Sequence, residues 1–241
     1  MKIALCLHGL FNSTTDSTSN GVDGFEYIKE NILSKGEVDI YIHSWDLDKK
    51  EEILNLYNPK SYLFDQQKDF SNLIKERHIN SLTTYPRPPQ NVLSHFYSIS
   101  EVFKLLYETK EKYDIVIKSR FDLGRINRNT SGPGNHNPYP VQCINFITNI
   151  EKDKLYMANW NHFNMGPADM WFYGDQHLMG NFTGLYDSLI SQFHLNSDFH
   201  KFAINIEGNV GDLSNSIAFY KWWMMENGLW NKRINLDTVW K

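Results

Sequence analysis

Three short apolar runs are the clearest pattern in this chain. They cover residues 3–7, 38–43 and 114–118, and Ile, Leu and Val dominate them. Such runs are typical of strands buried on both faces of a parallel sheet. Two shorter segments, 155–158 and 170–173, have the same character and predict two further strands.

The segments between these strands have helical spacing. Residues 25–33 form an amphipathic pattern that closes near Gly36, and residues 92–112 carry apolar side chains on one helical face. We predict two further helices at 176–193 and 214–227. Strands that alternate with helices predict an α/β fold, a sandwich with a largely parallel sheet.

The placement of loop-forming segments predicts one domain, residues 1–241, with an internal boundary. Residues 125–140 contain almost no large apolar side chains and predict a long loop between a first half, 1–124, and a second half, 141–241. Residues 48–80 are mixed and helical in parts, and the prolines within 85–89 predict a loop.

Composition and net charge exclude some classes of protein and disfavour others. The 241 residues are 41% hydrophobic and 22% charged, with a formal net charge of -4. These values exclude a disordered chain or a coiled coil and disfavour a nucleic-acid coat or a partner of anionic membranes. Neither an export signal nor a membrane span is indicated, so we expect a cytoplasmic protein. Cys6 and Cys143 form no CxxC pair.

Aromatic residues are unusually frequent, at 15% of the chain, with 7 Trp. Trp45 is early, whereas the other six lie between residues 160 and 240. Either a core or a binding surface would explain this skew, because Trp and Tyr pack in cores and also stack on sugar faces. Core packing is the simpler account of Trp222 and Trp223, which are adjacent on one predicted helix.

Polar residues follow each of the three apolar runs. His8-Gly9 follows the first, Asp46 the second, and Arg120 and Asp122 the third. Because ligands bind beyond the carboxyl ends of parallel strands, we expect these groups to share a cleft. Asp122 suits Mg²⁺ or Mn²⁺ but could instead pair with Arg120, which could clamp a diphosphate or form an ordinary ion pair.

Two further carboxylates flank the predicted strand at 170–173. Asp175 opens a helix and is a good N-cap. Asp169 precedes apolar residues directly, so it is either a general base or a turn residue. Other signatures are missing from the sequence: it has no G-x-S-x-G elbow, dinucleotide glycine pattern, P-loop or HExxH.

The ordered motifs resemble a family of small bacterial and viral glycosyltransferase-like proteins. They are KIALCLHG, VDIYIHSWD, LYNPK, HFYSISEVFKLLYE, YDIVIKSRFDL, PADMWFYGDQHLM and SIAFYKWWMMENGL. The resemblance spans most of the chain. It implies a GT-A-type nucleotide-diphospho-sugar transferase fold, a three-layer sandwich around a mostly parallel, Rossmann-like sheet.

The resemblance also implies roles for single residues. Arg120-Phe121-Asp122 occupies the Asp-x-Asp-like element, with Asp122 as ligand of Mn²⁺ or Mg²⁺ and Arg in place of the first Asp. Position 168 is Ala where the family often has Asn. The remaining implied roles are nucleotide-sugar binding by His8, Gly9, Asp46, Lys118 and Arg120, and acceptor binding by Trp160, Trp171 and Asp175 beside Asp169.

The implied reaction transfers a sugar from a nucleotide-diphosphate-sugar donor, with a UDP-sugar as the expected donor, to a carbohydrate hydroxyl. The metal and Arg120 would offset charge on the leaving diphosphate. Asp169 would be the base of an inverting reaction, or would only position groups in a retaining one. Two alternatives use the same fold: a non-catalytic carbohydrate- or nucleotide-binding protein, and a sugar-nucleotide hydrolase or nucleotidyltransferase. A viral member would act in the host cytoplasm.

Overall fold

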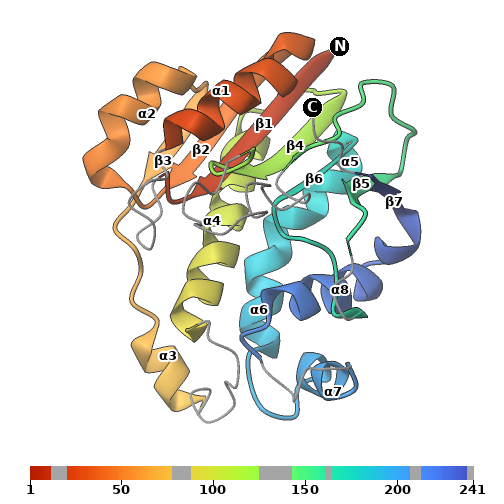
Figure 1. Cartoon of the computed structure of the whole chain (residues 1–241). Coiled ribbons are helices and arrows are strands. Elements are labelled where there is room, and N and C mark those ends of the chain that lie inside the picture. Colours follow the sequence, from red (N-terminus) through yellow and green to blue (C-terminus); the bar gives the residue numbers. More distant parts are fainter. Residues whose placement is uncertain (12–20, 78–87, 125–142, 161–163, 207–212, 238–241) are drawn as a thin grey trace, which may run out of the picture.

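The computed structural model describes residues 1–11, 21–77, 88–124, 143–160, 164–206 and 213–237. Seven strands in these residues form one sheet in the order β3-β2-β1-β4-β6-β5-β7 (Figure 1). β6 is antiparallel to both of its neighbours, and the other pairs are parallel. The strands are β1 Lys2–Gly9, β2 Glu37–Ser44, β3 Ser61–Phe64, β4 Ile115–Arg120, β5 Leu155–Ala158, β6 Trp171–Gly174 and β7 Arg233–Leu236.

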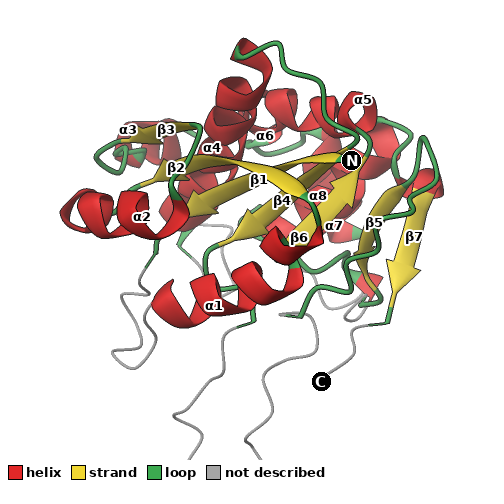
Figure 2. Cartoon of the chain, turned by 90° about the horizontal axis from the view of Figure 1, so that it is seen from above, coloured by secondary structure: helices red, strands yellow, loops and turns green. Residues whose placement is uncertain are grey.

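Helices cover both faces of this sheet. Figure 2 shows α1 and α2 on one face and α4 and α6 on the other. The described helices are α1 Gly21–Asn31, α2 Lys50–Tyr57, α3 Ser71–Glu76, α4 Pro89–Glu108, α5 Gln176–Met179, α6 Leu185–Gln192, α7 Asp198–Ile204 and α8 Ser216–Glu226. The 3-10 turns are η1 Leu33–Lys35, η2 Leu47–Lys49, η6 Gly180–Gly184 and η7 Trp230–Lys232.

The central strands are apolar throughout because both of their faces are buried. In β1, Leu5 packs in the core on the α1 side, whereas its neighbour Cys6 packs in the core on the α4 side. Both side chains are fully buried. The α/β fold class with a mostly parallel sheet between helical layers is therefore confirmed, and all five predicted strands are present.

Several expectations differ from the observed elements. The edge strands β3 and β7 were not predicted, and the helix expected at 176–193 is divided into α5, η6 and α6. Gly180 and Gly184 bound the interruption, and glycine disfavours a continuous helix. The loop expected at 125–140 lies outside the described residues. No described helix is long and apolar enough to cross a membrane.

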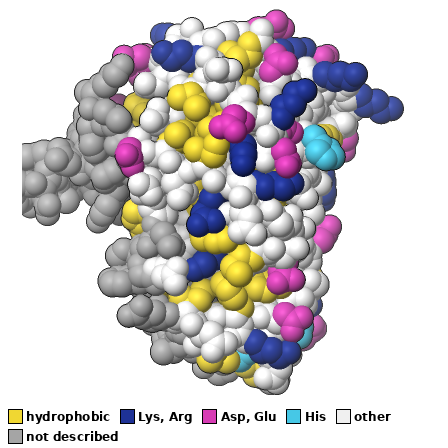
Figure 3. All heavy atoms as spheres, turned by 90° about the vertical axis from the view of Figure 1, so that its right-hand side faces the viewer, with side chains coloured by type: hydrophobic (Ala, Val, Ile, Leu, Met, Phe, Trp, Pro, Cys, Tyr) yellow, Lys and Arg dark blue, Asp and Glu magenta, His cyan; other side chains and the backbone are white. Residues whose placement is uncertain are grey.

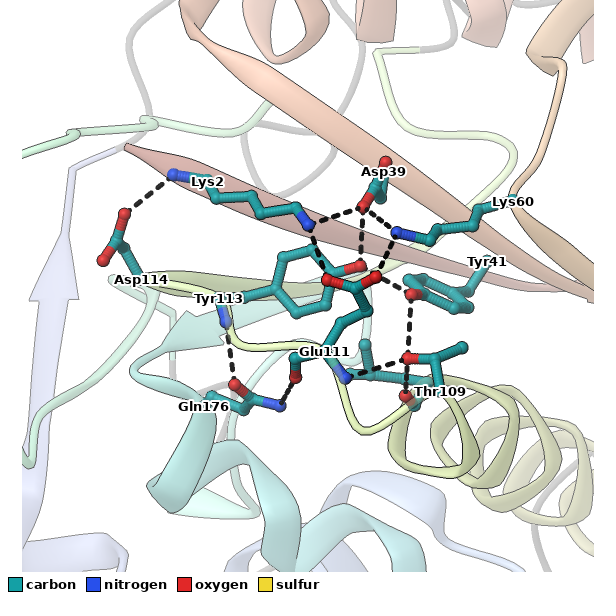
Figure 4. Close-up of polar contacts among 10 residues, drawn as sticks. Lys2, Asp39, Tyr41, Lys60, Thr109, Glu111, Tyr113, Asp114 and Gln176 are labelled. Atoms are coloured by element: carbon teal, nitrogen blue, oxygen red, sulfur yellow. Dashed lines mark hydrogen bonds and ion pairs between the residues drawn. The ribbon is translucent and has the colours of Figure 1, made fainter.

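A polar network closes the amino edge of the sheet (Figure 4). Asp39 accepts hydrogen bonds from Lys60 Nζ at 2.7 Å and from the Tyr113 hydroxyl at 2.7 Å. Lys2 Nζ donates to Glu111 at 2.8 Å, and Lys60 Nζ lies 3.2 Å from the same carboxylate. Two cations thus face two carboxylates, and the network compensates its own charges while it joins β1, β2 and the segment after α4.

Among the described residues, the late tryptophans Trp171, Trp222 and Trp223 belong to the core. Trp222 and Trp223 are 8% and 2% exposed within the core on the α4 side, as expected. The ring centroid of Trp230 lies 4.0 Å from the guanidinium carbon of Arg233 and 5.5 Å from the ammonium nitrogen of Lys221. Much of the aromatic surplus is therefore structural.

Figure 3 shows apolar, basic and acidic side chains interspersed over the face that carries β7.

Candidate functional site

The carboxyl edge of the sheet brings together side chains from β1, β2 and β4. His8 pairs in register with both His43 and Arg120, and Cys6 pairs with Lys118. Because side chains alternate along a strand, His8, Lys118 and Arg120 lie on the face that Cys6 shares with α4. Helix α4 contributes His95 from its second turn. The carboxyl ends of β1 and β4 therefore lie beside one another under α4.

Arg120 lies between two carboxylates. Its Nε donates to Asp122 Oδ1 at 2.8 Å and its Nη2 to Asp122 Oδ2 at 2.6 Å, a bidentate pair. Its Nη1 lies 3.6 Å from Asp169 Oδ1. Asp122 is the main reason that the pKa of Arg120 is raised. The ion pair that the sequence left open for Asp122 is thus observed, and Asp169 joins it.

A buried lysine, Lys118, contacts the backbone of Asp169. Its side chain is fully buried, and its Nζ donates a hydrogen bond to the backbone carbonyl of Asp169. The ammonium also lies 5.1 Å and 5.6 Å from the ring centroids of Phe172 and Tyr220. Burial lowers the pKa of Lys118 to about 7, although the Asp169 carboxylate opposes that shift. Lys118 therefore fixes the segment that carries Asp169.

A close backbone approach also positions Asp169. Gly166 has a φ of +152°, and a Cβ there would lie 2.2 Å from the carbonyl oxygen of Ile217 in α8. Only glycine permits this contact. Lys221 Nζ donates to the carbonyl and the side-chain oxygen of Asn164 at 2.6 and 2.8 Å, which holds the same segment against α8.

Two site residues were missed from the sequence, namely His95 and Tyr220. His95 Nε2 lies 3.1 Å from the Tyr220 hydroxyl and 3.8 Å from Asp169 Oδ2. Both residues lie within helices whose apolar spacing concealed them. The only signal was a histidine among the apolar positions of residues 92–112. Their role depends on α4 and α8 meeting over the strand ends.

His8 and Gly9 end β1 in different environments. His8 is 1% exposed, and neither ring nitrogen has a hydrogen-bond partner among the described residues. Burial, followed by the charges of Lys118 and its neighbours, holds the pKa of His8 well below its ordinary value. Gly9 has a φ of +97°, and no atom of the described residues lies within 4 Å of a Cβ built there. The described part of the chain thus leaves this side of Gly9 open.

Asp46 lies at the start of the turn after β2. Its carboxylate accepts a hydrogen bond from the Phe11 amide, and the Ser44 hydroxyl donates to the Gly9 carbonyl at 2.9 Å. These bonds join the ends of β1 and β2. Asp46 therefore borders the same edge as His8 and Gly9.

The described residues do not fit a divalent cation at Asp122. Each of its oxygens accepts a hydrogen bond from Arg120, whose positive charge would repel a cation bound to the same carboxylate. Within the described ranges, no three His, Cys, Asp or Glu side chains form a group that could hold a metal ion.

The acceptor set predicted from the sequence is not brought together. Trp171 is 1% exposed and stacks on Tyr173, so it presents no ring face to a sugar. Asp175 caps α5 by accepting from the Leu178 amide at 2.9 Å, which confirms the cap. Because β6 is antiparallel, Asp175 lies at the amino edge, away from Arg120. Half-buried Trp160 follows the carboxyl end of β5, on the edge that carries Arg120.

Comparisons with known proteins place the chain only loosely. No family model and no curated protein matches it. Among solved structures it is similar to mouse xyloside xylosyltransferase 1 in its apo form, at 10% identity and a TM-score of 0.46. That match covers 100% of this chain and 86% of the other. A likeness of this degree carries no argument about activity.

Proposed function

We propose that this protein transfers a sugar from a nucleoside-diphosphate sugar to a carbohydrate hydroxyl, with a UDP-sugar as the expected donor. The observation that carries the proposal is the Arg120 guanidinium 3.6 Å from the Asp169 carboxylate at the carboxyl edge of the sheet. Ligands of parallel α/β sheets bind at this edge. The ordered motifs that resemble the glycosyltransferase-like family support the same class of reaction.

In this proposal Asp169 is the general base. The acceptor hydroxyl gives its proton to Asp169, and its oxygen forms a bond to the anomeric carbon. The bond from that carbon to the diphosphate breaks, and the diphosphate leaves with the electron pair. Arg120, whose side chain is 34% exposed, offsets the negative charge that develops on the leaving group.

The remaining residues of the proposed site border the donor, orient the base or contact the acceptor. The open side of Gly9 permits a donor to approach the β1 backbone, with Asp46 at the border of that space. His95, whose Nε2 is 3.8 Å from Asp169 Oδ2, orients the base. Trp160 is the aromatic residue that we assign to the acceptor, because it follows a strand that ends at this edge.

Product analysis tests the proposed function. Nucleoside-diphosphate sugars are incubated with and without a panel of mono- and disaccharides, and free nucleotide and glycoside product are measured. We expect nucleotide release that depends on an acceptor and that is reduced about 100-fold or more by Asp169→Asn, which keeps the shape but removes the base. Equal release without acceptor would instead identify a hydrolase.

One observation favours a second candidate, a non-catalytic nucleotide- or carbohydrate-binding protein. Arg120 already neutralises Asp122, so the site holds its charges in a stable pair. A binding protein would take up the nucleotide sugar and release no product with any acceptor. The same experiment separates the two, because binding without turnover supports the second candidate alone.

A further inference from the structure

The guanidinium of Arg120 lies between the two carboxylates of the site, those of Asp122 and Asp169. Arg120 forms a bidentate pair with Asp122, at 2.8 and 2.6 Å, and its third nitrogen is 3.6 Å from Asp169. The two carboxylates are 16% and 13% exposed, so solvent screens them little. A guanidinium thus occupies the position from which a bound cation would bridge them.

A divalent cation that bridged the two carboxylates would have to displace this guanidinium. It would have to replace two charge-assisted hydrogen bonds and then lie beside the positive charge of Arg120. Both effects oppose metal binding.

Arg120 also keeps donors for an anion. A guanidinium has five N–H groups, and within the described chain only two of those of Arg120 are in hydrogen bonds. The remaining donors lie on Nη1 and Nη2, at the end of a side chain that is 34% exposed. The planar fork matches two oxygens of a phosphate. The pair with Asp122 fixes the plane of the fork before a ligand arrives.

We propose that Arg120 binds the diphosphate group of a nucleoside diphosphate directly, without a divalent cation. The inference rests on the proposed function for the identity of the ligand, but its claim about the metal is separate. Asp122 and Asp169 are then positioning residues that hold the guanidinium. The ligand class is a nucleoside diphosphate or its sugar ester.

Thermal unfolding with UDP, GDP, ADP and CDP, each in EDTA and in Mn²⁺, tests the inference. We expect at least one nucleotide to raise the Tm in EDTA, by about 5–10 °C at about 100 times its Kd. Arg120→Gln should raise that Kd about 10- to 100-fold. The matched control is Arg233→Gln, at the amino end of β7, which should leave the Kd unchanged.

A second variant tests the metal claim without any nucleotide. Arg120→Asp removes the guanidinium and places a carboxylate two residues before Asp122. Mn²⁺ alone should raise the Tm of this variant, because the ion relieves repulsion among three carboxylates. Mn²⁺ alone should leave the wild-type Tm unchanged.

The outcomes separate this inference from the proposed function. A wild-type nucleotide shift that requires Mn²⁺ and vanishes in EDTA would overturn the inference and leave the transferase proposal standing. If no nucleotide shifts the Tm in either condition, the proposed function and the direct diphosphate contact both fail. A rise in the wild-type Tm with Mn²⁺ alone would contradict the metal claim in either case.

Discussion

Replacing Lys118 by Met should make the protein more stable while weakening nucleotide binding. Lys118 is fully buried, and its only hydrogen bond among the described residues runs to the Asp169 carbonyl. Met has a similar length, fills irregular core space and carries no charge. A side chain kept only for structure would give the opposite result, because its removal would lower stability.

The size of the effect follows from the pKa of Lys118. Burial lowers that pKa from 10.5 to about 7. Relative to a lysine whose pKa is the same in both states, Lys118 therefore costs the folded state about 4 kcal/mol at pH 7. The Lys118→Met variant avoids this cost but leaves the Asp169 carbonyl without its donor, which costs about 1–3 kcal/mol. We expect a net stabilisation of about 1–3 kcal/mol.

The pH dependence identifies the cause. Since the folded-state pKa of Lys118 lies below its ordinary value, the unfolded chain binds more protons between pH 7 and 10.5, and stability rises with pH across that window. The cost falls to about 2 kcal/mol at pH 9, so the advantage of Lys118→Met should shrink by about 2 kcal/mol from pH 7 to pH 9.

Urea unfolding at pH 7 and pH 9 measures both quantities, with UDP titrated against each variant. The control is Lys60→Met, which removes a Lys that pairs with Asp39 and Glu111 at the opposite, amino edge of the sheet and should leave UDP affinity unchanged. A Lys118→Met variant that is less stable than wild type at pH 7 would refute the energetic reasoning. So would a stability difference that is equal at both pH values.

Three further predictions concern Asp39 at the amino edge of the sheet, Gly166 in the segment before Asp169, and His43 in β2 beside His8. Asp39→Asn should lower the free energy of unfolding at pH 7 by about 1–3 kcal/mol. Burial opposes ionisation of Asp39, yet hydrogen bonds from Lys60 and Tyr113 lower its pKa, so the deficit should disappear as the pH of urea unfolding falls through that pKa. Gly166→Ala should destabilise by about 1–3 kcal/mol in urea and reduce donor turnover, because its Cβ would lie 2.2 Å from a carbonyl oxygen of α8. Burial lowers the pKa of His43 to about 4, so this residue alone should lower stability by about 2 kcal/mol from pH 7 to pH 5, and His43→Gln should reduce the total fall in that window by about the same amount.

The sequence predicted the central sheet well for a physical reason. Strands buried on both faces, such as β1 and β4, must be apolar at nearly every position, and that pattern is local. The edge strands β3 and β7 have four residues each and are only partly buried, so they carry no comparable signal. Their existence depends on the neighbouring strand that they pair with.

The site was predicted only in part because strand direction and helix docking are not local properties. Arg120, Asp122 and His8 follow parallel strands, so their convergence could be expected. Asp175 ends an antiparallel strand and lies at the wrong edge, and nothing in its neighbours reveals that direction. His95 reaches Asp169 only because α4 packs across the strand ends.

A crystal structure of the protein with UDP in EDTA would test the central claim most directly. We predict a diphosphate at the carboxyl edge, with an oxygen about 3 Å from a guanidinium nitrogen of Arg120 and no metal ion beside Asp122. A diphosphate bound instead at the amino edge, in the groove lined by Tyr113 and Gln176, would contradict the account.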